Sequence, residues 1–370
     1  MRIAIVGCGQ LSRMLALAGL PLGIKFSFIN DTGAQTTDCV DGLGRIVALP
    51  TNWQKEQNIH ALYNLLGKPD CITVEKEQLD VKLLQALQTY CDIYPNPEAI
   101  IPCQHRYLEK QLLEKLSIPT SPFTYSLSAN ETVKKLQLPM VAKSCSDGYD
   151  GKNQWVLKTS EDVINFDNLN IQDYIIEAWI KFEREISLVS VRAKNGDIEH
   201  YPLTDNIHES GILKQSIAPA IDPNNALTTQ ANAYMESLLT ALDYVGVMAM
   251  ECFVINGELM INELAPRVHN SGHWTQVGSV TCQFENHVRA LAGLQLGSTK
   301  TLGTNGMINL IGTEKPPFES LSALSKLHWY NKSVKPLRKL GHVNFFDKDR
   351  ENLVQQMYDF NQAVILNDSH

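Results

Sequence analysis

The chain has 370 residues, enough for roughly two or three domains with ample cores. Hydrophobic residues make up 44% of it and charged residues 19%, as in ordinary globular proteins. A net charge of -8 argues against nucleic acid or an anionic membrane as a partner, and no apolar run is long enough to span a membrane. The eight cysteines form no CxxC pair, so we expect reduced thiols in a cytoplasmic protein and neither a disulfide framework nor a zinc site.

Short apolar runs alternate with helical patterns over the first hundred residues. Strands are expected at residues 2–6, 25–30, 45–48 and 71–74, and a helix at 10–22 follows the first of them. This βαβ order predicts a parallel, Rossmann-like sheet.

The remainder of the chain predicts α+β units with antiparallel strands. Clustered prolines near residue 100 indicate the first boundary, and the tail shows only short strands near 307–311 and 342–346. The predicted fold class is α/β and α+β, multidomain, with a small C-terminal β unit. The expected domains are residues 1–103, 104–180, 181–304 and 305–370.

A glycine turn follows the first predicted strand, over Gly7-Cys8-Gly9-Gln10-Leu11-Ser12. The backbone amides of such a turn can approach an anion at the N-terminus of the next helix. The match to the dinucleotide motif GxGxxG is partial because Ser12 replaces the third glycine, although Asp31 stands where a ribose-binding acid would. The residues leave three alternatives open: a phosphate-bearing substrate, NAD(P), or a purely structural turn.

A second glycine-bearing loop spans residues 147–154, after an apolar strand that ends at Lys143. Amides and ammonium groups of such a loop can fold over a triphosphate. The loop is no Walker P-loop, since GxxxxGK[ST] is absent. The alternative is a solvated β-turn.

Two carboxylates, Glu251 and Glu263, lie on a predicted hairpin whose turn is Asn256-Gly257. Carboxylates that face one point suit Mg2+, which takes one or two of them together with phosphate oxygens. A strict two-residue turn would pair Glu251 with Asn262 and send Glu263 to the other face. We therefore expect a longer connection or a bulge, because either restores facing carboxylates. The alternative is an edge hairpin with solvated acids.

Each of three further segments has two interpretations, one as part of a binding site and one as ordinary surface or structural residues. The strand end at 177–180 can pair its backbone with adenine while an acid such as Glu185 takes ribose, but such acids are often merely solvated. Residues 206–211 are predicted to form a polar turn, in which His208 alone would be structural. The basic segment 335–342 is either a clamp for a sugar phosphate or a solvated turn.

Taken together, these motifs resemble the N5-carboxyaminoimidazole ribonucleotide synthases, which are ATP-grasp ligases of purine biosynthesis. The resemblance covers nearly the whole chain, and residues 262–274 (Asn-Glu-Leu-Ala-Pro-Arg-Val-His-Asn-Ser-Gly-His-Trp) are its most specific part. It implies a pre-ATP-grasp domain, an ATP-grasp lid and central subdomain, and a C-terminal domain. It also implies carboxylation of 5-aminoimidazole ribonucleotide with ATP and bicarbonate, through carboxyphosphate.

The resemblance also implies the role of each site residue. ATP would be bound by Arg106, Lys143, Gly148, Tyr149, Asp150, Gly151, Lys152, Gln154, Glu177, Ala178, Trp179, Ile180, Glu185, His208, Asn262 and Glu263. Mg2+ would be held by Glu251 and Glu263. The catalytic residues would be Glu75, Tyr149, Lys152, Arg267 and His269. The ribonucleotide would also be contacted by Gln10, Leu11, Asn270, Ser271, Lys335 and Arg338.

The expected partners are small molecules and a second copy of the chain in a homodimer, with no nucleic acid and no membrane. Ser12 and Asn153 stand where family members often have glycine, and Ala265 stands where many ATP-grasp enzymes have asparagine. Three rival functions are a formate-dependent ribonucleotide transformylase, an NAD-linked oxidoreductase and a non-catalytic nucleotide-binding protein.

Overall fold

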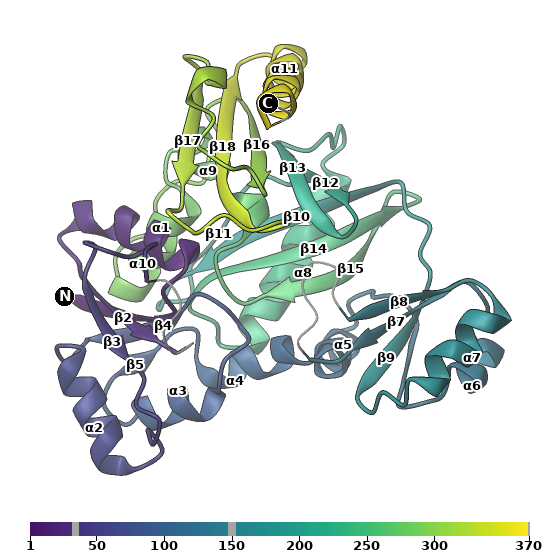
Figure 1. Ribbon diagram of the computed structural model, residues 1–370, viewed down its shortest axis with the longest axis horizontal. Coiled ribbons are helices and arrows are strands. Elements are labelled where there is room, and N and C mark those ends of the chain that lie inside the picture. Colours follow the sequence, from purple (N-terminus) through teal and green to yellow (C-terminus); the bar gives the residue numbers. More distant parts are fainter. Residues whose placement is uncertain (32–36, 147–152, 369–370) are drawn as a thin grey trace.

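A computed structural model describes residues 1–31, 37–146 and 153–368, which form three β-sheets. Figure 1 shows an N-terminal sheet and a small sheet on opposite sides, below a large central sheet. Within the described residues, no helix has both the length and the apolarity that crossing a bilayer requires.

The N-terminal sheet is parallel, in the order β3-β2-β1-β4-β5. The four strands expected in this region have the bounds that their apolar runs predicted. The strands are β1 (Arg2–Val6), β2 (Lys25–Asn30), β3 (Arg45–Ala48), β4 (Cys71–Val74) and β5 (Asp92–Ile93). The helices are α1 (Gln10–Gly19), α2 (Glu56–Leu65), α3 (Val81–Leu87) and α4 (Pro97–Ile100).

Helix α1 ends at Gly19, three residues before its predicted end. Leu20–Leu22 forms a separate 3-10 turn with Pro21 in its first positions. Proline has no amide hydrogen to continue the α-helical ladder, so the tighter turn replaces it.

The small sheet has four antiparallel strands in the order β6-β9-β7-β8 and follows helix α5 (Arg106–Lys115). Its strands are β6 (Phe123–Tyr125), β7 (Met140–Ser144), β8 (Gln154–Leu157) and β9 (Tyr174–Ala178). Helices α6 (Ala129–Leu136) and α7 (Ser160–Asn168) pack on it, and each begins with a capping box.

The central sheet runs β15-β14-β10-β12-β13-β16-β18-β17, with β11 paired to β10. Its strands are β10 (Arg184–Arg192), β11 (Ile198–His200), β12 (Thr204–Glu209), β13 (Ile212–Ala218), β14 (Gly246–Ile255), β15 (Glu258–Ala265), β16 (Thr304–Ile311), β17 (Ser325–Trp329) and β18 (Lys339–Asp347). The helices against it are α8 (Ala226–Ala241), α9 (Thr275–Gly278), α10 (Gln283–Ala292) and α11 (Arg350–Asp368). The C-terminal strands therefore extend the central sheet.

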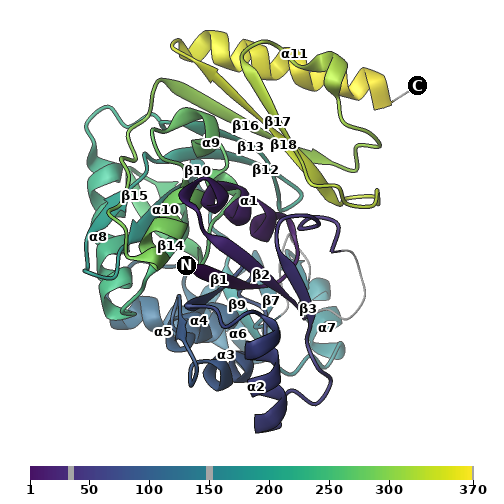
Figure 2. The same cartoon turned by 90° about the vertical axis from the view of Figure 1, so that its left-hand side faces the viewer.

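Helix α11, which covers the C-terminal strands in Figure 2, was not predicted. The expectation of only short strands in the tail was incomplete. Leu353, Met357 and Phe360 are buried and are spaced four and three residues apart, which is the pattern of an amphipathic helix.

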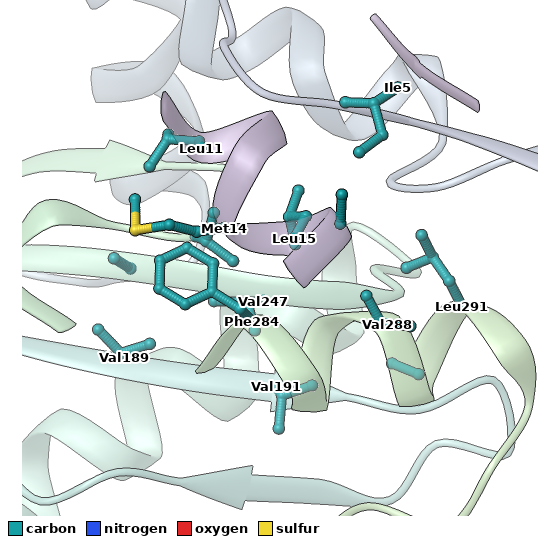
Figure 3. Close-up of a cluster of buried hydrophobic side chains, with 14 of the residues drawn as sticks. Ile5, Leu11, Met14, Leu15, Val189, Val191, Val247, Phe284, Val288 and Leu291 are labelled. Carbon is teal, nitrogen blue, oxygen red and sulfur yellow. The ribbon is translucent and has the colours of Figure 1, made fainter. Parts of the chain in front are cut away.

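The N-terminal and central sheets share one hydrophobic core, part of which is drawn in Figure 3. Met14 and Leu15 on α1 belong to the same buried cluster as Phe284 and Val288 on α10. Because this contact joins the two sheets, the glycine turn just before α1 is held in place relative to the central sheet.

Replacing Leu15 by alanine should lower the free energy of unfolding by about 2–5 kcal/mol, because this side chain is fully buried in the shared core. Leu17→Ala on the same helix is the matched control, since Leu17 is 44% exposed, and it should change stability by no more than about 0.5 kcal/mol. Urea unfolding followed by circular dichroism measures both. Equal losses in the two variants would contradict the position assigned to this core.

Candidate active site

The predicted hairpin is formed by β14 and β15, and it brings the two acids together. Ile255 pairs with Glu258, so Asn256-Gly257 is a two-residue turn, with φ of 50° and 78°. The expectation that the connection is longer was wrong, and the expected bulge is present. Ile261 pairs with Cys252 while Glu263 pairs with Glu251, which leaves Asn262 as the extra residue on β15.

The two carboxylates face each other in a partly buried position. Burial and the charge of Glu263 raise the pKa of Glu251 to about 7. The Nη1 atom of Arg106 lies 3.9 Å from a carboxylate oxygen of Glu263. Two hard oxygen donors that repel each other are the ligand chemistry that Mg2+ requires, so these residues fit the predicted metal.

A small hollow of about 170 Å3 lies beside the paired acids. Its lining includes Glu185, His208, Glu251, Phe253 and Asn262. Glu185 accepts a hydrogen bond of 2.6 Å from Nδ1 of His208. Burial opposes the charged imidazole, but this hydrogen bond and the negative charges of Glu251, Glu185 and Glu263 together outweigh it and raise the pKa of His208.

The prediction of a polar turn at 206–211 was only partly right. Asn206 and His208 lie on strand β12, and only Ser210 and Gly211 make the turn. Because Asn206 pairs with Glu185 across β12 and β10, the strand geometry determines where these polar groups lie in the site.

A buried ion cluster joins the small sheet to α5. Glu177 on β9 receives Lys143 Nζ at 2.5 Å and Lys110 Nζ at 3.0 Å, one on each carboxylate oxygen. Burial alone would raise the pKa of Glu177, but the two ammonium groups lower it to about 2. Both oxygens are thus engaged by lysines, and Lys110, to which the sequence assigned no role, is 1% exposed.

The predicted triphosphate loop is described only at its edges. Gly148, Tyr149, Asp150, Gly151 and Lys152 lie outside the described residues. Beyond them, Asn153 has φ of 52°, a conformation that asparagine tolerates well, and Gln154 begins β8.

At the other predicted adenine contact, Ala178 ends β9 and pairs with Met140, and Trp179 next to it is 48% exposed. Ile180 follows outside the strand. The amides of Ala178 and Trp179 donate to the carbonyls of Pro122 and Pro139, so the strand end offers the aromatic surface of Trp179 and the backbone that leads to Ile180.

The glycine turn is closed by an acid from the neighbouring strand. Glu75 accepts hydrogen bonds from the amides of Gly9 at 2.7 Å and Ser12 at 3.0 Å. Gly7 has φ of +119°, and a Cβ there would lie 2.4 Å from Glu75, so glycine is required. Ser12 is buried and donates to the Gly7 carbonyl, so it closes the turn.

Two residues predicted from this turn have different environments. The Leu11 side chain is 8% exposed and belongs to the shared core. The Gln10 side chain instead accepts a hydrogen bond from Lys332 Nζ at 2.5 Å. Sequence reasoning did not find Lys332.

Arg267 forms a two-pronged ion pair with Glu77, through Nε to Oε2 and through Nη2 to Oε1 at 3.1 Å. Burial would raise the pKa of Glu77, but the guanidinium lowers it. No local pattern indicates Glu77 as a site residue, because the ion pair joins residues 190 positions apart.

A buried chain of hydrogen bonds ends at His269. In this chain each side-chain hydroxyl or amide donates to the next residue, and the last donor is the Ser271 hydroxyl. The backbone amide of Ser271 also donates to His269 Nδ1, at 3.3 Å. The chain runs Ser216 to Asn206 to Ser187 to Ser271 to His269.

This chain determines the tautomer of His269. Since Nδ1 accepts, the ring hydrogen is on Nε2, which lies 3.7 Å from Glu251 Oε1. Burial and the charge of Arg267 hold the pKa of His269 well below its ordinary value. His269 is therefore a neutral donor that faces the paired acids.

Within the basic segment, the predicted substrate residues and their neighbour Lys339 lie in different surroundings. Lys335 is exposed, and Arg338 bonds to Ser333. Lys339 donates from Nζ to Asn270 Oδ1 and so reaches the predicted substrate residues.

Models of three families match the chain in succession. They are the ribonucleotide synthetase pre-ATP-grasp domain over residues 1–104, the ATP-grasp domain over 111–284, and the phosphoribosylaminoimidazole carboxylase C-terminal domain over 305–356.

Curated relatives and solved structures match over nearly the whole length of the chain. The chain is 41% identical to an N5-carboxyaminoimidazole ribonucleotide synthase from Pseudomonas aeruginosa, over 95% of this chain and 96% of that protein. It is 40% identical to the synthase from Vibrio cholerae, over 93% and 90%. The structure of the Thermus thermophilus synthetase superposes with a TM-score of 0.88 at 38% identity, covering 98% of each chain. The Staphylococcus aureus enzyme complexed with ADP gives a TM-score of 0.87 at 28% identity, over 97% and 96%.

These matches confirm the expected fold class and set aside the transformylase, the oxidoreductase and the non-catalytic protein. With the paired acids and buried lysines in one site, the chain belongs to the N5-carboxyaminoimidazole ribonucleotide synthase family of ATP-grasp ligases.

Proposed function

We propose that this chain carboxylates the exocyclic amine of 5-aminoimidazole ribonucleotide at a centre between the Glu251/Glu263 pair and Lys143. The observation that supports this most is the bulge that sets the two carboxylates opposite each other. A bicarbonate oxygen forms a bond to the γ-phosphorus of ATP while the bond between that phosphorus and the leaving oxygen of ADP breaks. The amine nitrogen then bonds to the carboxyl carbon, phosphate leaves, and the nitrogen loses a proton.

Glu251 and Glu263 would hold Mg2+ beside the triphosphate, and the ion would neutralise phosphate charge during transfer. Arg106, which lies 3.9 Å from Glu263, would reach the same phosphates. Positioning and charge neutralisation provide most of the rate acceleration in phosphoryl transfer. Glu251, Glu263 and Arg106 would therefore contribute most to catalysis of this step.

The buried ion cluster changes the role that we assign to Glu177. Its carboxylate orients Lys143 and Lys110, so adenine would be held by the backbone from Ala178 to Ile180. Two ammonium groups against one carboxylate leave a net positive charge, which would attract the triphosphate.

Glu185, with its partner His208, would bind the ribose of ATP at the hollow beside the acids. His269 would orient Glu251 through its Nε2 hydrogen, because in this tautomer it donates and does not accept a proton. The phosphate released from carboxyphosphate would then take the amine proton.

The ribonucleotide would lie between the glycine turn and the segment from Arg267 to Ser271. Glu75 would bind it there, and Gln10 and Asn270 would lie near its phosphate because both already accept hydrogen bonds from lysines. The hydroxyl and the amide of Ser271 are both engaged in the buried chain, so Ser271 would act mainly by orienting His269.

Three expectations remain predictions: the domain boundaries, the homodimer and the cytoplasmic location. All eight cysteines lie in the described part of the chain and are unpaired, which favours a reducing compartment. The molecular mass in solution measures the oligomeric state.

Glu263→Gln should reduce turnover by at least about 100-fold, since it removes half of the carboxylate pair that would hold the metal. The melting temperature of the metal-free protein should not fall, because the substitution removes repulsion between the two acids. Glu258→Gln is the matched control, because Glu258 is exposed on the same hairpin. ADP release, coupled to NADH oxidation and measured with and without each substrate, tests both variants. Near-full activity of Glu263→Gln would refute the metal assignment.

Mg2+ binding should release protons near neutral pH. The pKa of Glu251 is raised to about 7, so part of this carboxyl is protonated there and must lose its proton to bind the ion. In the absence of metal, the same shift makes stability fall as pH rises from about 4.5 to 7, because the folded state binds more protons. The apparent affinity for Mg2+ should therefore increase from pH 6 to pH 8.

Calorimetry in two buffers of different ionisation enthalpy measures this release. Glu109→Gln is the control, because it removes another buried acid whose pKa is raised to about 7, partly by the charge of Glu263, while both carboxylates of the pair stay in place. No proton release in the parent enzyme would contradict Glu251 as a ligand.

Lys332→Ala should raise the KM for the ribonucleotide by about 10-fold or more, because a charge-assisted bond to phosphate is lost. Lys335→Ala should change this KM by less than about threefold, because Lys335 is exposed and lies outside the contacts to Gln10 and Asn270. Steady-state kinetics at saturating ATP compare the two. A larger increase in KM for Lys335→Ala than for Lys332→Ala would contradict this assignment and support the phosphate clamp at residues 335–342 that the sequence predicts.

A further inference from the structure

The ammonium groups of Lys332 and Lys339 lie near one buried aromatic ring. Each Nζ is 5.8 Å from the centroid of Tyr330, which is 1% exposed. A cation within about 6 Å of an aromatic face is attracted by the ring quadrupole. One side chain can thus influence where both charges stand.

The two lysines reach different parts of the fold. Lys332 donates to Gln10 at the start of α1, and Lys339 donates to Asn270 after β15. Both acceptors are amide oxygens, and phosphate oxygens could accept from the same ammonium groups. Tyr330 therefore lies at the junction of the N-terminal and central sheets, behind the predicted phosphate position.

The Tyr330 hydroxyl is held by a directed chain of buried groups. Gln276 Oε1 can only accept, so His342 Nε2 donates to it at 2.9 Å. The other ring nitrogen, Nδ1, then accepts from the Tyr330 hydroxyl at 2.5 Å. Gln276 Nε2 lies 3.5 Å from Nδ1 of His328 and completes the chain.

This chain is neutral and rigidly packed. Burial holds the pKa of His342 well below its ordinary value, so the ring adds no positive charge beside Lys339. Its ring stacks on His328, with centroids 4.5 Å apart and planes 6° apart. Gln276 lies on α9, so the tyrosine is tied through β18 to that helix.

We propose that Tyr330 is a positioning residue for the ribonucleotide phosphate, placing Lys332 and Lys339 while His342 and Gln276 hold its hydroxyl. The proposal rests on the proposed function, because it takes the phosphate of the substrate as the anion that the lysines bind. Tyr330 itself touches no reacting atom. Losing its hydroxyl leaves His342 Nδ1 buried without a donor, so the ring and both lysines should shift.

The test is Tyr330→Phe, compared with Tyr358→Phe on α11, which removes a hydroxyl from a side chain 58% exposed. Tyr330→Phe should raise the KM for the ribonucleotide by about 5- to 10-fold, with kcat and the KM for ATP within about twofold. Tyr358→Phe should match the parent. A parallel loss in kcat and in the KM for ATP would show a merely structural role and overturn the proposal.

A double-mutant cycle with Lys332→Met tests whether Tyr330 acts through the lysine. Adding Tyr330→Phe to Lys332→Met should raise the KM by a smaller factor than Tyr330→Phe does in the parent, because one of the two charges that Tyr330 positions is gone. Full additivity would overturn the proposal.

If Tyr330→Phe does not fold, Gln276→Met breaks the same chain one step away and should give the same selective rise. An unchanged KM in that variant would overturn the proposal. The parent enzyme separates the two claims. If the parent enzyme releases no ADP in response to the ribonucleotide, the proposed function fails. If the parent enzyme releases ADP but the variants leave the KM for the ribonucleotide unchanged, only the role of Tyr330 fails.

Discussion

The site depends on two like charges that the central sheet forces together. Glu251 and Glu263 are cross-strand neighbours, and burial with mutual repulsion raises the pKa of Glu251 to about 7. Such a pair is unfavourable without a cation. The arrangement requires one extra residue, Asn262, because a perfect ladder from the Asn256-Gly257 turn would send Glu263 to the opposite face.

The other charges of the site are arranged around this pair by separate sheets. The small sheet supplies Lys143 and Glu177, and α5 supplies Arg106 and Lys110. The N-terminal sheet supplies Glu75 and the glycine turn, which the shared core holds against the central sheet.

Much of the fold follows from local patterns. Strands β1, β2 and β4 are apolar runs that are almost entirely buried, and the hairpin was predicted from Asn256-Gly257. The sequence could predict only that either a bulge or a longer turn is present, because no residue near Asn262 distinguishes between the two. Helix α11 was missed although Leu353, Met357 and Phe360 show helical spacing.

The partners of the site residues were harder to predict, because tertiary contacts choose them. Glu177 was expected at adenine, yet two lysines engage its carboxylate. Glu77 pairs with Arg267 across 190 positions, and Lys332 crosses to Gln10 from the far end of the chain. Within the basic segment, the backbone leaves Lys335 exposed and directs Lys339 inward, which composition alone does not reveal.

The central claim is that the two acids of the bulged hairpin bind the metal of the nucleotide. The most direct measurement is anomalous diffraction from crystals grown with Mn2+, a Mg2+ substitute, and a non-hydrolysable ATP analogue. A metal peak within about 2.2 Å of carboxylate oxygens from both Glu251 and Glu263 is the predicted result. A metal bound to the phosphates alone, with these two side chains turned away, would contradict the account.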